Sequence, residues 1–324
     1  MPEPGPREVL VEVRAVGVCG SDVHYYEHGR IGPYVVSEPL ILGHESGGVV
    51  VGRGPGADRH QLGQRVALEP GVPCGRCRQC RAGRYNLCPE VRFFATPPID
   101  GAFCNYLTIH EDFAFALPDG VSDDAGAMME PLSVGIWACR KAGLQGGEHV
   151  LVTGAGPIGL LAMQAALALG ATRVTVADVN PHRLELARRT GAATVLDLRG
   201  QPLGEAGVEA DVLLECSGHP AALADGIRSL RPAGVAVAVG MGPGEEATVP
   251  LALLQNRELT LTGTFRYANT YPTAIELVAT GRVDVEAIVT DHYPLQQAEQ
   301  ALQTGKQDPT SVKAVVVPTM EATP

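Results

Sequence analysis

The stretch from residue 148 to about residue 265 constrains the fold most, because strand-like and helix-like segments alternate along it. Residues 149–153 form an apolar run, residues 158–169 have helical character closed by Gly170, and residues 173–178 form a second apolar run. This order predicts a βαβ unit. A helix after Pro181 and further strands predicted at 194–196, 211–214, 235–239 and 259–262 continue the pattern. Six such strands predict a doubly wound sheet.

Three glycines lie at the first strand-to-helix turn of this region. Gly154, Gly156 and Gly159 read G-x-G-x-x-G, which lets the backbone approach a pyrophosphate at a helix N-terminus. The motif alone is a weak signal, but its βαβ context favours a dinucleotide site over an ordinary turn. Asp178 ends the second strand, where a carboxylate accepts the ribose hydroxyls of NAD and repels the 2′-phosphate of NADP. Arg183 follows, either as a contact to the adenosine end or as a solvated side chain.

The N-terminal part of the chain has a different residue pattern. Residues 7 to about 125 are broken by Gly and Pro and carry short apolar runs such as 9–13 and 48–51. This pattern predicts a small β-barrel with long loops. The tail carries a predicted helix at 271–280 and a last strand at 312–317, which have no sheet of their own. We therefore expect the tail to return to the first domain.

Four cysteines stand close together in the N-terminal part. Cys74, Cys77, Cys80 and Cys88 read C-x2-C-x2-C-x7-C on a loop rich in Gly and Arg. Four thiolates close a tetrahedral zinc site and leave no open position for chemistry. The spacing therefore predicts a structural zinc.

A second, mixed set of possible ligands lies nearer the N-terminus. Cys19, His44 and Glu45 offer a thiolate, an imidazole and a carboxylate, which leaves a fourth position free for water or substrate. Each residue alone would more often be a core residue than a ligand. Together with a dinucleotide site, they predict hydride transfer from an alcohol activated by a catalytic zinc.

Composition excludes several classes of partner. The formal net charge of −11 at pH 7 repels phosphate backbones, so we expect no nucleic acid and no anionic membrane as a partner. A nucleic-acid-binding zinc finger is excluded on the same ground. The sequence has neither a long apolar run nor a signal peptide at its start, and we expect a cytoplasmic protein with a small-molecule substrate. In a reducing compartment the clustered cysteines are better metal ligands than disulfides.

With these motifs in place, essentially the whole chain resembles the medium-chain zinc-dependent alcohol dehydrogenases. Within that family it is most similar to the branch that oxidises polyols such as sorbitol and xylitol. The stretches that carry the resemblance are residues 18–25, residues 43–48 with Gly54 and Ala57, Phe93 with residues 95–98, residues 130–135, residues 154–159 and residues 265–267.

The resemblance implies roles for individual residues. Cys19, His44 and Glu45 look like the protein ligands of the catalytic zinc, and Glu130 is similar to a carboxylate beside the zinc water. We expect Glu45 rather than Glu130 to bind the metal at rest. Ser21 is similar to a hydroxyl that bonds the reacting oxygen, and His24 to a residue that passes the proton outward. The expected polyol contacts are Tyr25, Phe93, Arg266 and Tyr267, and the expected NAD contacts beyond the glycines are Ile158, Asp178, Arg183, Gly240 and Phe265.

The same resemblance implies the architecture and the assembly. We expect a GroES-like β-barrel catalytic domain at residues 1–128, an NAD-binding Rossmann domain at 129–265 and a return to the catalytic domain at 266–324. Family members usually begin earlier, with a further strand, so the barrel is expected to lack an edge strand. A homotetramer is expected from the resemblance alone. Two alternatives stay open: a related zinc dehydrogenase for threonine or butanediol, and a non-catalytic NAD-binding homologue.

Overall fold

The computed structural model describes residues 1–242 and 246–321, and these residues form two compact units. Of the described residues, unit 1 contains 1–130, 271–279 and 289–321, and unit 2 contains 131–242, 246–270 and 280–288. The units differ in detail from the predicted domains, because residues 266–270 and 280–288 group with unit 2. In the part of the chain that is described, no helix has the length and apolar character needed to cross a membrane.

Unit 1 is built on a seven-stranded sheet whose core is formed by apolar side chains such as Val11, Val50 and Val66. Its strands, in spatial order, are β16 (Val289–Pro294), β17 (Lys313–Val317), β1 (Glu8–Gly17), β4 (Glu45–Arg53), β5 (Arg65–Leu68) and β9 (Ala114–Ala116), and β8 (Tyr106–His110) also pairs with β1.

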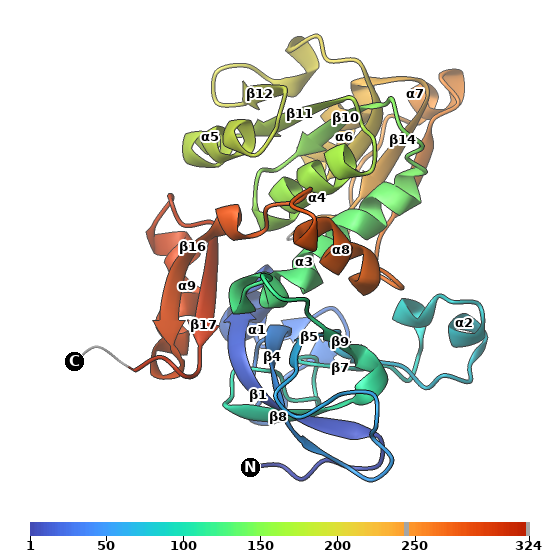
Figure 1. Cartoon of the computed structure of the whole chain (residues 1–324). Helices are drawn as coiled ribbons and strands as arrows, with labels where there is room; N and C mark the ends of the chain where they lie inside the picture. The colour runs from blue at the N-terminus through green and yellow to red at the C-terminus, as the bar shows by residue number, and fades with distance from the viewer. Residues whose placement is uncertain (243–245, 322–324) are drawn as a thin grey trace. The chain divides into compact units, whose positions relative to one another are not determined.

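Strand β1 organises this sheet because it has partners along both edges. Along one edge it pairs with β4, with Gly17 opposite Glu45. Along the other edge residues 8–12 pair with β8, and Val16 and Gly17 pair with β17. The end of β1, the start of β4 and the start of β17 therefore meet at one place. Figure 1 shows β17, in red, beside β1, in dark blue.

Shorter elements complete unit 1. They are α1 (Gly20–His28), β2 (Arg30–Ile31), β3 (Tyr34–Val35), β6 (Gly71–Val72), α2 (Arg78–Arg81), η1 (Tyr85–Leu87), β7 (Arg92–Phe93), η2 (Glu111–Phe113), α8 (Tyr271–Ala279), η5 (Leu295–Gln297) and α9 (Ala298–Gln307). The long helix α3 (Asp123–Ala142) begins in unit 1, and the boundary between the units falls at Pro131 inside it.

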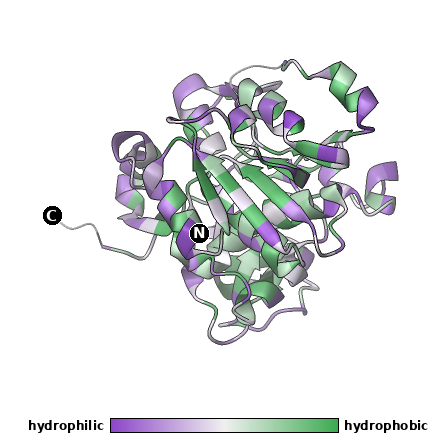
Figure 2. Cartoon of the chain, turned by 90° about the horizontal axis from the view of Figure 1, so that it is seen from above, coloured by the Kyte–Doolittle hydropathy of each residue, from purple (hydrophilic) through white to green (hydrophobic). Residues whose placement is uncertain are grey.

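Unit 2 confirms the predicted doubly wound sheet. Its six strands are parallel and lie in the order β12 (Thr194–Asp197), β11 (Arg173–Asp178), β10 (His149–Thr153), β13 (Ala210–Glu215), β14 (Leu230–Ala238) and β15 (Thr260–Gly263). Strand β10 is buried throughout, as expected for a central parallel strand, and the strands of the sheet are coloured largely as hydrophobic in Figure 2. The order reverses between β10 and β13, which is the switch point of such sheets.

The predicted elements of unit 2 match in type and shift at their ends. The remaining elements of this unit are α4 (Pro157–Ala168), α5 (Pro181–Arg189), η3 (Leu203–Glu205), α6 (Pro220–Arg228), α7 (Leu251–Asn256) and η4 (Glu286–Ile288). Strand β14 begins five residues before the predicted residue 235, at Leu230. Its first half contains Pro232 and Gly234, residue types that argue against a strand, and between them Ala233 adopts a positive φ of 62°. The sequence therefore did not predict this half of the strand.

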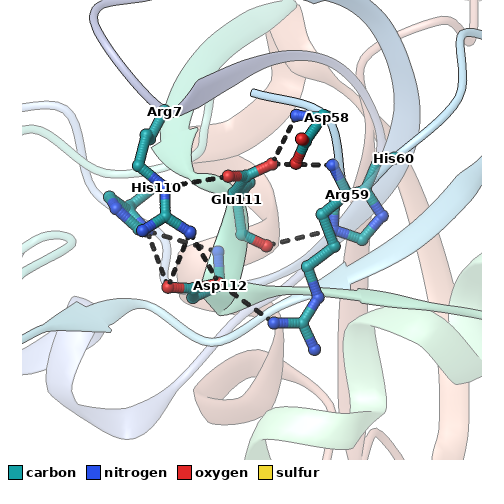
Figure 3. Close-up of polar contacts among 7 residues, drawn as sticks. All are labelled: Arg7, Asp58, Arg59, His60, His110, Glu111 and Asp112. Atoms are coloured by element: carbon teal, nitrogen blue, oxygen red, sulfur yellow. Dashed lines mark hydrogen bonds and ion pairs between the residues drawn. The ribbon is translucent and has the colours of Figure 1, made fainter. Parts of the chain in front are cut away.

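A charged network fastens Arg7, the residue before β1, to the loop at residues 58–60 and to Glu111. The buried Glu111 carboxylate accepts hydrogen bonds from the Arg7 guanidinium at 3.0 Å and from the backbone N–H groups of Asp58 and Arg59 at 2.9 Å each. His60 Nε2 donates to the Glu111 carbonyl oxygen at 3.0 Å (Figure 3). Glu111 therefore ties together three segments that are far apart in the sequence.

Replacing Glu111 with Gln should lower the free energy of unfolding by about 2 kcal/mol, because charge-assisted hydrogen bonds are lost. The N–H of Arg59 and the Arg7 guanidinium hold the pKa of Glu111 below its usual value, against burial, which acts to raise it. The stabilisation is therefore present above pH 4.5 and lost as pH falls through that lowered pKa, and Glu111→Gln should remove this acid dependence. Denaturation across pH measures both effects. Asp112→Asn, at an exposed partner of Arg7, is the control; an equal loss there would contradict this role of Glu111.

Candidate active site

The structure brings together the three residues of the mixed set. Glu45 is the first residue of β4, His44 precedes it, and Cys19 lies two residues after β1. Because Gly17 pairs with Glu45, the three side chains converge, and one ligand atom from each lies within 4.8 Å of the others. His44 and Glu45 are buried. Thiolate, imidazole and carboxylate are the donors that zinc prefers, so this donor set fits the metal.

Asp22 orients the ligands, and sequence reasoning assigned it no role. Its fully buried carboxylate accepts hydrogen bonds from Cys19 N at 3.0 Å and Gly43 N at 2.9 Å, and lies 3.4 Å from His44 Nδ1. Burial acts to raise the pKa of Asp22, but His44 and these N–H groups outweigh it and hold the pKa below its usual value. A carboxylate behind an imidazole fixes the ring orientation and leaves Nε2 for a metal. The sequence feature that could have indicated this role is the position of Asp22, three residues after the predicted ligand Cys19.

Lys313 is the second residue that sequence reasoning missed. Its ammonium donates to the two Glu45 carboxylate oxygens at 2.8 and 2.6 Å and to the Val18 carbonyl oxygen at 2.8 Å. Both side chains of this ion pair are almost fully buried. Burial acts to lower the pKa of Lys313, but the charges of Glu45 and Cys19 outweigh it and hold the pKa above its usual value. A lysine at the start of an apolar strand gives no sequence signal of this contact.

Two further buried carboxyl groups belong to the same part of unit 1. Glu69 directly follows β5, one residue after Leu68, which pairs with Ser46 of β4, and Tyr85 donates a hydrogen bond to it at 2.7 Å. Burial, together with the charge of Glu130, raises the pKa of Glu69 to about 7, against the hydrogen bond from Tyr85, which acts to lower it. Glu130 is also buried, on α3. With Cys19 and Glu45 nearby, this concentration of acidic groups around Lys313 favours a bound dication.

The other predicted residues of unit 1 lie on two elements. Ser21, His24 and Tyr25 are on α1; Tyr25 is buried, while His24 is exposed with its ring 4.6 Å from that of His28. Phe93 is buried on β7 and places its ring 5.7 Å from the His44 ring.

The four clustered cysteines form a second possible metal centre. The sulfurs of Cys74, Cys77, Cys80 and Cys88 lie within 4.8 Å of one another, and none forms a disulfide. Cys77 caps α2 by accepting from Cys80 N at 3.5 Å, and Cys88 accepts from Cys74 N at 3.4 Å. The N–H of Cys80 is the main cause that lowers the pKa of Cys77 to about 7, which favours the thiolate. Four sulfur donors fit a structural zinc.

In unit 2 the predicted cofactor residues gather at the carboxyl end of β10. Gly154 adopts a positive φ of 86°, and a Cβ on Gly159 would overlap the Gly154 carbonyl oxygen, so only glycine permits this turn. Gly156 caps α4, whose second residue is Ile158. Asp178 accepts hydrogen bonds from Ala155 N in the glycine-rich turn and from Asn180 N at 2.7 Å.

The remaining predicted residues also lie in unit 2. A Cβ on Gly156 would be 4.0 Å from an Arg183 guanidinium nitrogen, so Arg183 lies beside the glycine-rich turn. Gly240 follows β14; Phe265 is 45% exposed, and the Arg266 guanidinium lies 4.9 Å from its ring centre. Tyr267 is buried. The predicted polyol contacts are thus divided: Tyr25 and Phe93 in unit 1, Arg266 and Tyr267 in unit 2.

Comparison with known proteins gives two family matches. Residues 5–119 match the alcohol dehydrogenase GroES-like domain, and residues 157–280 match the zinc-binding dehydrogenase family. Sorbitol dehydrogenase of Bacillus subtilis is 45% identical over 315 residues, which cover 95% of this chain and 89% of that protein.

Solved structures agree with these matches. An Escherichia coli oxidoreductase/dehydrogenase of unknown specificity superposes with a TM-score of 0.93 at 36% identity, covering 98% of this chain and 93% of that one. L-idonate 5-dehydrogenase from Escherichia coli superposes with a TM-score of 0.89 at 33% identity, covering 96% of this chain and 91% of that one.

The two cysteine-containing centres should respond differently to substitution. Elemental analysis should give two zinc ions per subunit, one for each ligand group. Cys80→Ser should remove one zinc and lower the unfolding midpoint, because a closed site contributes to folding. Cys19→Ser should remove the other zinc and abolish turnover in a protein that keeps its fold. Identical behaviour of the two variants would contradict the division into structural and catalytic sites.

In the zinc-free protein, Lys313→Met should lower the free energy of unfolding by about 3–5 kcal/mol, because it leaves the Glu45 carboxylate buried without a cation. Lys306→Met is the matched control, since Lys306 pairs with Glu27 at the surface and its side chain is 64% exposed. The control should change stability little. Urea denaturation of both variants measures the free energy of unfolding. Equal losses in the two variants would contradict the claim that the buried Lys313–Glu45 pair contributes more than the exposed pair.

Proposed function

Because the chain belongs to the zinc-dependent alcohol dehydrogenase family, we propose that it oxidises a secondary hydroxyl of a polyol to the ketose, with NAD as hydride acceptor. The observation that carries the proposal is the convergence of Cys19, His44 and Glu45, one ligand atom of each within 4.8 Å of the others. The identity of 45% to a sorbitol dehydrogenase supports sorbitol, xylitol or a similar polyol as the substrate.

The residues of unit 1 would hold and activate the substrate hydroxyl. Zinc, held there by Cys19, His44 and Glu45, would supply the charge that lowers the pKa of an alcohol near it. Asp22 keeps the His44 ring in position, and burial of the ligands strengthens each electrostatic contact. Glu130, buried in the same unit, would lie beside the reacting oxygen.

The proton of the substrate hydroxyl needs a path to solvent. Ser21 and His24 are three residues apart on α1, so they share one face of this helix. We assign Ser21 to the reacting oxygen and His24, which is exposed, to the outward transfer of the proton. An imidazole suits this task because it can accept a proton at one ring nitrogen and donate one at the other.

The cofactor preference follows from Asp178. Its carboxylate stands at the end of β11 beside the glycine-rich turn, where the adenosine ribose of a dinucleotide binds. A 2′-phosphate at that place would meet this negative charge, and the following residues Val179 and Asn180 provide no cation. We therefore propose NAD rather than NADP as the hydride acceptor.

The predicted substrate contacts favour a ligand with several hydroxyls. Ser21, Tyr25, Glu130, Arg266 and Tyr267 carry hydroxyl, carboxylate and guanidinium groups, whereas a pocket for simple alcohols should be apolar. Polar groups built to bond substrate hydroxyls reject analogues that lack them, by factors that reach about 10⁴.

The relatives imply a small-molecule substrate, and we propose a homotetramer in the cytoplasm. A homotetramer rests on family resemblance, and a cytoplasmic location on the sequence features given above. Acidic net charge is the argument against nucleic acid or a membrane as partner.

The wild type should reduce NAD with sorbitol or xylitol much faster than with threonine, butanediol or 2-propanol, and faster than it reduces NADP. Arg266→Ala should raise KM for polyols about tenfold, which corresponds to one lost hydrogen bond to a charged group, with a smaller change in NADH affinity. Absorbance at 340 nm and NADH fluorescence provide the two readouts. Arg199→Ala, at an exposed arginine paired with Asp197, is the control.

Each other outcome points to a specific alternative. Preference for threonine or butanediol would assign the chain to those related dehydrogenases, and preference for 2-propanol would remove the polyol assignment while leaving zinc and NAD in place. NADH binding without turnover on any of these alcohols would favour the non-catalytic homologue. Equal loss of polyol and NADH affinity in Arg266→Ala would place Arg266 on the cofactor phosphates.

A further inference from the structure

We propose that Glu215 is a positioning residue that holds the backbone beneath the nicotinamide half of the cofactor. Glu215 is the last residue of β13 and is buried. It lies between Thr153 of β10 and Ala238 of β14 in the strand register. The inference rests on the proposed dinucleotide site of unit 2, and no sequence motif singled out this residue.

The Glu215 side chain collects donors from the turn that follows it. Its carboxylate accepts from Ser217 N at 2.8 Å, from the Ser217 hydroxyl, and from Gly218 N at 3.1 and 3.2 Å. Thr153 Oγ1 lies 3.4 Å away on the neighbouring strand. Among the ion pairs of residues 1–242 and 246–321 none involves Glu215, so N–H and O–H groups alone stabilise its carboxylate.

The backbone of Glu215 binds the neighbouring segments as well. Its carbonyl oxygen accepts from both Val239 N and Gly240 N at 2.8 Å, just after β14. Cys216 N donates to the Thr153 carbonyl oxygen at 2.8 Å, just before the glycine-rich turn. Glu215 and its neighbour thus join the ends of three adjacent strands.

Glycines allow these segments to pack backbone against backbone. A Cβ on Gly154 would lie 2.8 Å from Ser217 Cα, and one on Gly218 would lie 2.5 Å from the Met241 carbonyl carbon. A Cβ on Gly240 or Gly242 would overlap the backbone of Gly218. The turn at 216–218 is therefore packed between the glycine-rich turn at 154–159 and residues 240–242. The glycine-rich turn is also held from β11, because Gly154 N donates to the Ala177 carbonyl oxygen and Ala155 N donates to Asp178, so a shift of the 216–218 turn would displace mainly residues 240–242.

The position of Asp178 decides which half of the cofactor this turn supports. A dinucleotide crosses the switch point between β10 and β13, with its pyrophosphate at the glycine-rich turn. Asp178 ends β11, so the adenosine half lies over β11 and β12. The nicotinamide half then lies over the ends of β13 and β14, which are the segments that Glu215 holds.

A buried carboxylate is a costly way to close a turn. A neutral side chain would cap the N–H groups of Ser217 and Gly218 without the desolvation penalty of a charge. The charge strengthens each of these hydrogen bonds, because bonds to ionised acceptors are about twice as strong as neutral ones. The charge of Glu215 therefore holds the 216–218 turn in place before the cofactor binds, at a cost in the free energy of folding.

The test separates the two halves of the cofactor by titrating ADP and NADH into the zinc-loaded enzyme. ADP carries the adenosine half with both phosphates and lacks the nicotinamide. Glu215→Gln should weaken NADH binding about tenfold, the loss expected for charge-assisted bonds, while ADP binding changes less than about twofold. Ser217→Ala removes only the hydroxyl donor and keeps both N–H bonds, so it should weaken NADH binding only about twofold to threefold.

Asp178→Ala is the control with the opposite pattern, because it should weaken ADP and NADH alike. Urea denaturation shows whether each variant is folded; if Glu215→Gln does not fold, the Ser217→Ala titrations decide. Equal weakening of ADP and NADH by Glu215→Gln, or no weakening of either, would overturn the role given to Glu215. A wild type that binds neither ADP nor NADH would instead overturn the dinucleotide site on which this inference rests.

Discussion

The buried ion pair between Lys313 and Glu45 is the interaction on which the site of unit 1 depends. It joins β17, from the end of the chain, to β4 near its beginning, and the Lys313 ammonium also holds the carbonyl oxygen of Val18, next to Cys19. A Cβ on Gly17 would overlap the Glu45 carboxylate, so Gly17 provides the space in which this carboxylate lies. The lysine compensates one negative charge among several, which leaves a site that still attracts a cation.

The same device recurs at two other places with different partners. Glu111 holds two loops and Arg7 through a mixture of charge and backbone N–H groups, and Glu215 holds its turn with N–H and O–H groups alone. Glu45 and Glu111 join segments that the sheet itself does not pair, whereas Glu215 closes the turn that follows its own strand. Removing one of these carboxylates leaves several buried donors unsatisfied at once, which makes them costly positions to change.

The chemistry proposed for the chain is distributed over its two units. Unit 1 carries the residues that would hold zinc and move the proton, and unit 2 carries the turn and the carboxylate that would select and hold NAD. Two residues orient the ligands through hydrogen bonds: Asp22, three residues after Cys19, and Lys313, from the distant strand β17. Such second-layer contacts set the geometry of a metal site as much as the ligands do.

The sequence by itself determined what depends on local spacing. The strand–turn–helix pattern around Gly154 predicted the parallel sheet, the spacing of the four cysteines predicted their convergence, and Cys19, His44 and Glu45 were recognisable as a set of donors. Only the tertiary structure showed that Lys313 pairs with Glu45, that Tyr85 bonds the buried Glu69, and that Glu215 joins three strand ends. Those contacts arise from strand order and register between segments up to 268 residues apart, and no local pattern of residue types encodes such pairings.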